Sequence, residues 1–598
     1  MTISIMRSKA ALTPEAGTTV APHLVPRDRD PDVLRFRRAL LSTAWALVVI
    51  GLAGIVGLRR DATITSFYFA RDLIGLAALA AILVAAALLR APPALGGWLG
   101  LAARPRATAV VLALVVAVAA LAGTALVFDG TPIAYDEVMA EFDAAIFRSG
   151  RLIVALPAEW RAFLPALLPY FNLPVPGDGA WVSAYLPVAA MLRAGLGAVA
   201  HPAVTNPLLA AVAVVALIAV ARRLWPGRPD AAILAGLLLV TAPQVLFTAM
   251  TAFAMTAHLA LNLVWLRCFL RGGRLGHGGA AVIGFLACGL HQVVFHPLFA
   301  LPFLVGIVLR RHWGLAAFYA AIYAASGAVW ILYWQGVLTL AGLGREGAAT
   351  VGGGYLLARL ATMVEGFGWV GLNLMIKNLL RFVAWGSPLL LPLAALSWPA
   401  LRRGEGVARP LAAGIGLTLV AMLVLMPLQG HGWGYRYLHG LVGSACLLAA
   451  QGWVSLTARC DTGRRREMAA AFGAACAASL LLVVPARALE IRAFVRPYAS
   501  AIRAITTTDA DFVVVDDRGL MAYGADLVRN DPFLRNRPMV LLLDRLDAAA
   551  RAELCRRGSV AIFTPVDGAR LGIMTADRPL NRDQAPPLPC ASRPVLEP

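Results

Sequence analysis

Two adjacent carboxylates, Asp136 and Glu137, are the residues best suited to do chemistry in this chain. They lie in a stretch that begins at Gly130, directly after a long apolar run, and a short amphipathic helix follows them and ends near Gly150. A carboxylate held where a membrane span emerges can accept the proton of an incoming hydroxyl or amine. Both residues could instead cap the helix and favour its positive end. The apolar positions of this helix, which could lie on the bilayer, are Val138, Phe142 and Ile146.

A glycine-rich stretch at 429–439 supplies candidates for binding a phosphate. It carries His431, Arg436 and Tyr437 between glycines and aromatic residues. Arginine suits this role because its planar fork donates to two phosphate oxygens at once. The alternative is an aromatic belt with its charge anchored among lipid headgroups.

Further candidates for donor phosphate binding are spread along the chain. Lys377 and Arg359 lie in the region 340–378, and Lys377 begins an apolar run. His291 and His296 lie near the end of another run, where polar groups are costly and indicate function unless they bond to neighbouring helices. Their spacing of five residues does not favour a shared metal ion, unlike a spacing of four. We therefore assign no metal ligands.

The elements that position these residues are predicted from composition. The chain has 598 residues, 60% hydrophobic and 14% charged, which excludes most soluble proteins. Its apolar runs have the length that crosses a bilayer and predict a polytopic α-helical membrane protein with about thirteen spans. These runs are 39–58, 73–90, 107–127, 203–221, 231–250, 254–271, 280–296, 298–310, 314–338, 379–400, 411–428, 438–456 and 468–485.

Charge sets the predicted orientation. The net charge of +20 is nearly all arginine, and basic residues gather in cytoplasmic loops. The arginine clusters between spans become cytoplasmic only if the ambiguous segment 181–200 lies flat at the interface. We therefore predict that 1–38 is a disordered cytoplasmic tail and that 39–485 spans the membrane. The loop 129–202 then faces outward and carries the catalytic candidates.

The remainder, 486–598, is predicted to be a small extracytoplasmic α/β domain. Strands are expected at 512–516, 539–544 and 559–564, with a helix at 546–557. Asp516, Asp517 and Asp544 follow strands and could form a site or cap turns. Cys555 and Cys590 could pair if this region is exported.

The stretch around Tyr135–Arg151 resembles the first outer loop of the GT-C superfamily of integral membrane glycosyltransferases, which includes the protein O-mannosyltransferases and the lipid A aminoarabinose transferase. The segment Trp181–Pro187 resembles that family's interfacial helix with its proline motif, and the likeness covers about 129–310. It implies a polyprenyl-phosphate sugar donor, with Asp136 as base and Glu137 as a supporting acid or hydrogen-bond partner. The chain departs from this family in two ways. It has one span more than expected before the loop, and it carries Thr256 and His258 where many members carry an acidic residue. A divalent metal thus lacks a second acidic ligand here.

The expected function is therefore inverting transfer of a sugar from a polyprenyl phosphate to a glycan, lipid or protein acceptor on the outer face of a bacterial inner membrane. No nucleic-acid partner is expected. One alternative is an O-antigen polymerase or ligase, which needs no Asp-Glu pair at this point. Another is a transporter or flippase for lipid-linked sugars, which predicts mid-span ionisable groups and repeat symmetry. A non-catalytic membrane scaffold is the third.

Overall fold

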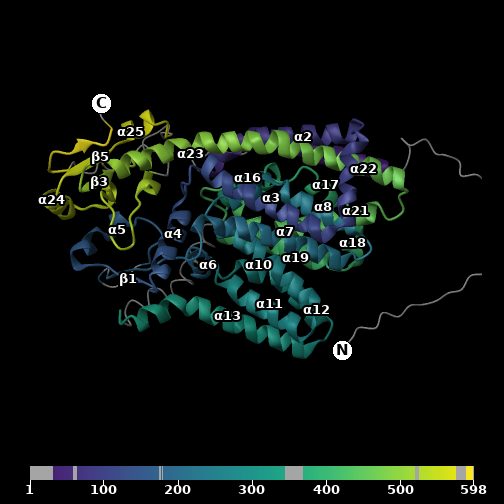
Figure 1. Cartoon of the computed structure of the whole chain (residues 1–598), viewed down its shortest axis with the longest axis horizontal. Helices are drawn as coiled ribbons and strands as arrows, with labels where there is room; N and C mark the ends of the chain where they lie inside the picture. Colours follow the sequence, from purple (N-terminus) through teal and green to yellow (C-terminus); the bar gives the residue numbers. More distant parts are fainter. Residues whose placement is uncertain are drawn as a thin grey trace, which may run out of the picture.

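The computed structural model describes residues 31–57, 64–343 (without 174, 176 and 178), 368–518, 524–573 and 588–596. Most of these residues are helical, and the helices lie side by side in a layered bundle (Figure 1). The helices of the bundle are α1 (Pro31–Gly57), α2 (Ile64–Leu88), α3 (Pro105–Leu126), α7 (Thr205–Leu224), α8 (Pro229–Val240), α9 (Pro243–Ala249), α10 (Met255–Arg271), α11 (Gly273–Cys288), α12 (Phe295–Leu309), α13 (Trp313–Leu340), α16 (Trp369–Ala384), α17 (Leu390–Ala395), α18 (Trp398–Arg403), α19 (Ala408–Leu425), α20 (Arg436–His439), α21 (Val442–Leu456), α22 (Thr462–Ala478) and α23 (Val484–Thr507).

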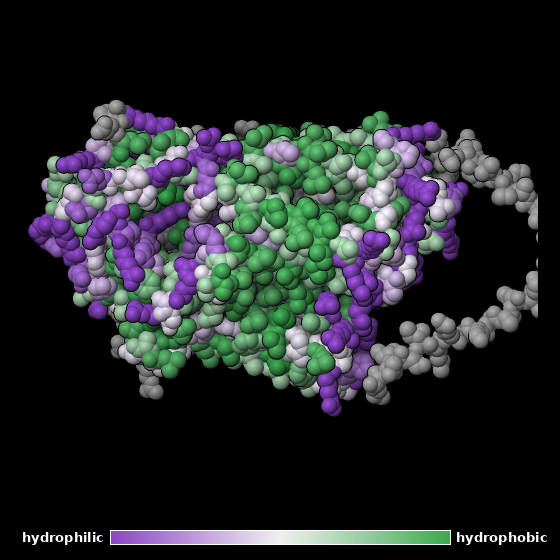
Figure 2. All heavy atoms as spheres, viewed as in Figure 1, coloured by the Kyte–Doolittle hydropathy of each residue, from purple (hydrophilic) through white to green (hydrophobic). Residues whose placement is uncertain are grey.

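Seven of the described helical segments are long and apolar enough to cross a membrane, or eight if the bent pair α8 and α9 forms one span. The predicted polytopic helical architecture is confirmed. The other predicted spans coincide with shorter helices, such as α10 with 17 residues and α12 with 15. Figure 2 shows the corresponding surface, an apolar belt between two hydrophilic ends.

The first helix starts earlier than its apolar run. α1 begins at Pro31, so residues 31–38 of the predicted tail are helical. Proline suits the first helical position because it has no N–H to leave unpaired, and Asp32 in the first turn complements the positive helix end. At the other end, α22 continues through a π-helical turn into α23, and the whole run spans Thr462–Thr507.

The loop 129–202 folds into short elements at one end of the bundle. These are α4 (Tyr135–Arg148), β1 (Val154–Ala155), α5 (Leu164–Leu167), β2 (Ala180–Trp181) and α6 (Val188–Leu196). The predicted interfacial segment therefore contains no helix longer than nine residues, far short of a span.

The C-terminal region forms the predicted α/β unit. Its strands are β3 (Phe512–Val515), β4 (Met539–Leu542), β5 (Val560–Phe563) and β6 (Arg593–Pro594), with helices α24 (Ala548–Arg557) and α25 (Pro565–Arg570). The sheet is parallel, in the order β4-β3-β5-β6. Cys555 and Cys590 form a disulfide, and Arg518 binds both carboxylate oxygens of Asp516 at 2.7 and 2.6 Å.

The outer loop and this sheet share one hydrophobic core. Phe142 and Ile146 of α4 pack in the same cluster as Trp181 from the loop and Phe512 and Leu541 from the sheet. The expectation that this face of α4 lies on the bilayer is wrong, because Phe142 and Ile146 are buried against protein. The C-terminal region thus holds α4, and with it Asp136, in place (Figure 1).

Candidate functional site

Asp136 meets groups from two other segments of the chain. Its carboxylate accepts a hydrogen bond from the hydroxyl of Tyr185, and Arg436 Nη1 lies 2.8 Å from its second oxygen. The ring of His291 stacks on Tyr185 with 4.3 Å between ring centres. Asp136 starts α4, Tyr185 precedes α6, His291 joins α11 to α12, and Arg436 opens α20. Residues 300 positions apart thus form one polar centre.

The environment keeps Asp136 ionised. Burial by itself raises the pKa of this carboxyl, but the Arg436 guanidinium and the Tyr185 hydroxyl outweigh it and hold the pKa below its ordinary value. Arg436 retains binding capacity, since its Nε is buried and has no hydrogen-bond partner. Its guanidinium also lies 4.5 Å from the centre of the Phe253 ring. The Asp136 carboxylate is therefore fixed beside the Arg436 guanidinium, which still has a hydrogen-bond donor that no described residue engages.

Glu137 is placed differently from its neighbour. One oxygen accepts from the backbone N–H of Ile133 and Ala134 at 2.9 and 3.3 Å, and the other from Ala252 at 2.9 Å. These bonds cap α4 and tie it to the connection between α9 and α10. Burial still leaves the pKa of Glu137 raised despite the three amides. The geometry favours the capping alternative for Glu137 and leaves Asp136 as the carboxylate facing the polar centre.

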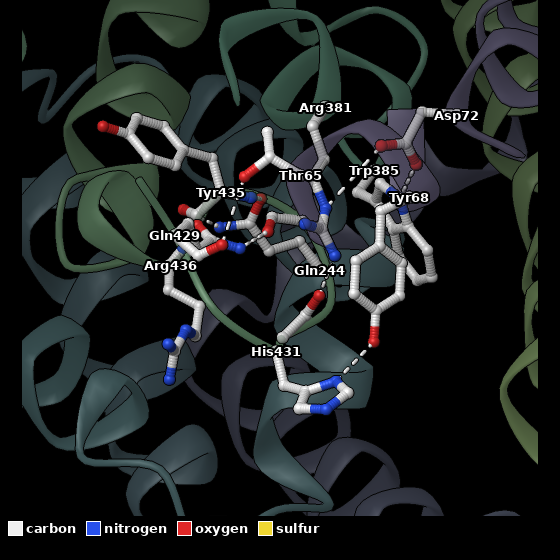
Figure 3. A network of polar contacts seen from close by, with 12 residues as sticks. Thr65, Tyr68, Asp72, Gln244, Arg381, Trp385, Gln429, His431, Tyr435 and Arg436 are labelled. Atoms are coloured by element: carbon white, nitrogen blue, oxygen red, sulfur yellow. Dashed lines mark hydrogen bonds and ion pairs between the residues drawn. The ribbon is translucent and has the colours of Figure 1, made fainter. Parts of the chain in front are cut away.

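Two glutamines fix the turn that carries Arg436 (Figure 3). Gln429 donates to the carbonyl of Gly434 at 3.0 Å and accepts from the backbone N–H of Arg436 at 2.8 Å. Gln244, from α9, bonds both the carbonyl and the N–H of Tyr435, at 3.0 and 3.2 Å. The backbone of Arg436 is therefore held on both sides, which fixes where its side chain begins.

The same turn links the bundle to the C-terminal region through His431. Tyr68 of α2 lies 2.9 Å from His431 Nδ1, and Asp526 lies 3.7 Å from Nε2 (Figure 3 shows the first contact). Burial raises the pKa of Asp526 well above its ordinary value. Nearby, Arg529 donates to the carbonyl of Pro132, three residues before the start of α4. His431 thus lies between two elements, whereas Arg436 contacts Asp136.

A small cavity, with room for about one water molecule, lies beside Arg436 and Tyr437. It is also lined by His258, which is buried and has no hydrogen-bond partner on either ring nitrogen. Tyr437 donates to the carbonyl of Leu428 at 3.3 Å. His258 can therefore donate to an anion placed next to Arg436.

The other predicted phosphate ligands are His296, Lys377 and Arg359. In the part of the chain that the structure describes, no hydrogen bond or ion pair links His296 or Lys377 to Asp136. His296 bonds Asn262 through one ring nitrogen and Tyr323 through the other, both at 2.8 Å, which is the helix-bonding alternative. Lys377 is buried on α16, next to Asn378, which donates to the carbonyl of Pro427. Arg359 lies outside the described residues. Among the residues that are described, no group of three or more His, Cys, Asp or Glu side chains could hold a metal ion.

Three members of the site were not selected from the sequence. Tyr185 stands in the Trp181–Pro187 motif, so its position before a proline was the available signal. His258 was noted only as a departure from the family pattern. Asp526 has no local motif, because its place depends on how the C-terminal region docks on the bundle.

Comparisons with known proteins give likeness in overall shape. No family model matches the chain, and no curated protein matches its sequence. A crystal structure of ArnT from Cupriavidus metallidurans bound to undecaprenyl phosphate covers 72% of this chain and 85% of its own, at 14% identity and a TM-score of 0.49. The apo structure of the same protein has the same coverage, at 12% identity and a TM-score of 0.47.

Proposed function

We propose that this protein is a membrane glycosyltransferase that moves a sugar from a polyprenyl-phosphate donor to an acceptor, with inversion at the anomeric carbon. The observation that carries the proposal is the contact between Asp136 and Arg436. It brings a carboxylate and a guanidinium together where helices of the bundle meet the outer loop, and these groups suit the roles of proton acceptor and phosphate-binding cation. The resemblance of the stretch around Tyr135–Arg151 to GT-C enzymes points to the same chemistry.

The chain's residues divide the reaction between them. The acceptor hydroxyl or amine attacks the anomeric carbon, and its proton passes to the Asp136 carboxylate. The bond from that carbon to the phosphate oxygen breaks, and both electrons leave with the phosphate. Arg436, assisted by His258 and Tyr437, stabilises the charge that develops there. Because the transfer is a single displacement, the configuration at the anomeric carbon inverts.

Donor binding also tunes the base. In the free protein Arg436 lowers the pKa of Asp136. When the guanidinium turns its donors to the phosphate, this effect weakens and the carboxylate becomes a better proton acceptor. His431, Lys377, His291 and Arg359 remain predicted donor ligands. Glu137 acts by positioning α4.

We place the protein in the bacterial inner membrane, with a cytoplasmic amino terminus and a periplasmic C-terminal domain (486–598) that follows the membrane domain (39–485). The arginine distribution and the Cys555–Cys590 disulfide support this orientation, since disulfides persist in oxidising compartments. The acceptor is then reached from the extracytoplasmic face.

The test measures sugar transfer from radiolabelled polyprenyl-phosphate donors in membranes that contain the full chain. Wild type should transfer label, Asp136→Asn should lose transfer, and Glu159→Gln should retain it. Glu159 is the matched control because it is an exposed carboxylate of the same outer loop. Equal transfer by the Asp136→Asn variant would remove Asp136 from the mechanism. Absence of transfer with every donor would favour the polymerase, ligase or transporter alternatives.

A further inference from the structure

A large cavity lies on the side of α4 that carries Glu137 and Glu141. Its volume is about 870 Å³. Its walls come from α3, α4, α6 and α23 together with the connections at 129–132, 201–203 and 250–252. The polar centre at Asp136 does not line it. The cavity is therefore a separate space that adjoins the proposed transfer site across one helix.

One wall of this cavity carries three arginines. Arg492, Arg496 and Arg503 lie on α23 at spacings of four and seven residues, which places them on one face of the helix, and all three line the cavity. Their side chains are exposed, and within the described part of the chain none of the three makes a side-chain hydrogen bond or ion pair. Three guanidinium groups thus line the cavity with hydrogen-bond donors that none of the described protein groups engages.

The carboxylates of the cavity wall are mostly engaged by other groups. Glu137 accepts from three backbone amides, and Glu141 pairs with Arg193 at 2.7 Å. Asp129 is the remaining carboxylate of the wall. The balance of unengaged charge in the cavity is therefore positive and suits an anion.

Another part of the lining is mostly apolar and belongs to a membrane-spanning helix, α3. Leu121 and Ala125 of α3 line the cavity, and Leu121 is 44% exposed. Exposed apolar side chains on a spanning helix face lipid. A hydrocarbon chain suits contact with these α3 residues, and an anionic head suits contact with the three arginines.

We infer that this cavity binds the phosphate-bearing headgroup of a membrane amphiphile, held by Arg492, Arg496 and Arg503. The headgroup lies among the arginines and its chain lies against α3. Guanidinium forks bind phosphate through two oxygens each, which favours a phosphate over a carboxylate of equal charge. The site is distinct from Arg436, and the inference does not depend on glycosyl transfer.

The test measures binding of dioleoyl phosphatidic acid to the purified full chain in detergent, with dioleoylglycerol as the lipid lacking phosphate. Wild type should bind the phosphate lipid at least about tenfold more tightly than an Arg492→Gln, Arg496→Gln, Arg503→Gln variant, because each basic residue near an anionic lipid adds to its affinity. A Ser500→Glu variant, which adds a carboxylate to the same face, should weaken binding similarly. Dioleoylglycerol should not compete.

The matched control replaces Arg274, Arg310 and Arg311, three exposed arginines near the ends of α11 and α12, by glutamine. That variant and Arg436→Gln should retain binding at the cavity. Unchanged affinity in both the triple α23 variant and Ser500→Glu would overturn the inference. Full displacement of the lipid by an equal concentration of inorganic phosphate would also overturn it, because the site would then recognise a free anion.

Discussion

The ion pair between Asp136 and Arg436 makes a quantitative prediction about coupling. The two side chains are 17% and 6% exposed and 2.8 Å apart, so each is the main counter-charge of the other. Removing one partner of a buried pair costs about 3–5 kcal/mol, because the remaining charge is left uncompensated. Arg436→Gln leaves the carboxylate with the Tyr185 hydroxyl and the nearby His291, and Asp136→Asn leaves the guanidinium against Phe253.

The double variant Asp136→Asn, Arg436→Gln removes both charges together. Its free energy of unfolding should therefore fall by less than the sum of the two single losses. The difference between that sum and the loss in the double variant should be about 1–3 kcal/mol. Steric trapping in bicelles measures these free energies for membrane proteins. Strictly additive losses would refute the reasoning, since they would show that the two side chains do not interact in the folded protein.

Two further outcomes follow from the same centre. The folded-state pKa of Asp136 is below its ordinary value near 3.9, so the stability that this pair contributes should be complete above about pH 5 and lost progressively as the pH falls below that. Thermal unfolding measured against pH should show that loss in wild type and not in Asp136→Asn. Gly434→Ala should destabilise the turn and lower activity without touching a charged group, because Gly434 has a φ of +80° and a Cβ there would lie 2.3 Å from Gln244 Oε1; wild-type thermal stability in this variant would contradict the role given to the two glutamines.

The helices and strands were largely predictable because each is encoded by its own residues. Apolar runs predicted the bundle, and the strands at 512–516, 539–544 and 559–564 were predicted from short runs of branched residues. Residues 31–38 were missed because that basic stretch has no apolar run, although α1 extends through it. The local sequence pattern does not show where a helix extends beyond its apolar span into polar turns.

The polar centre was predictable only in part. Asp136 and Arg436 were each selected from local sequence, but nothing in either stretch showed that they touch. The face of α4 was misassigned because amphipathicity shows that Phe142 and Ile146 are buried, not whether lipid or the C-terminal sheet buries them. Asp526 lies at the site through docking of a distant region, which one sequence does not reveal.

The most direct test of the central claim is a structure of the full chain in lipid with a polyprenyl phosphate bound. The phosphate should contact Arg436, and the distance from Arg436 Nη1 to the Asp136 carboxylate should exceed the 2.8 Å of the free protein. A phosphate found only among Arg492, Arg496 and Arg503, with the Asp136–Arg436 pair intact, would contradict the claim that this pair is the site of transfer.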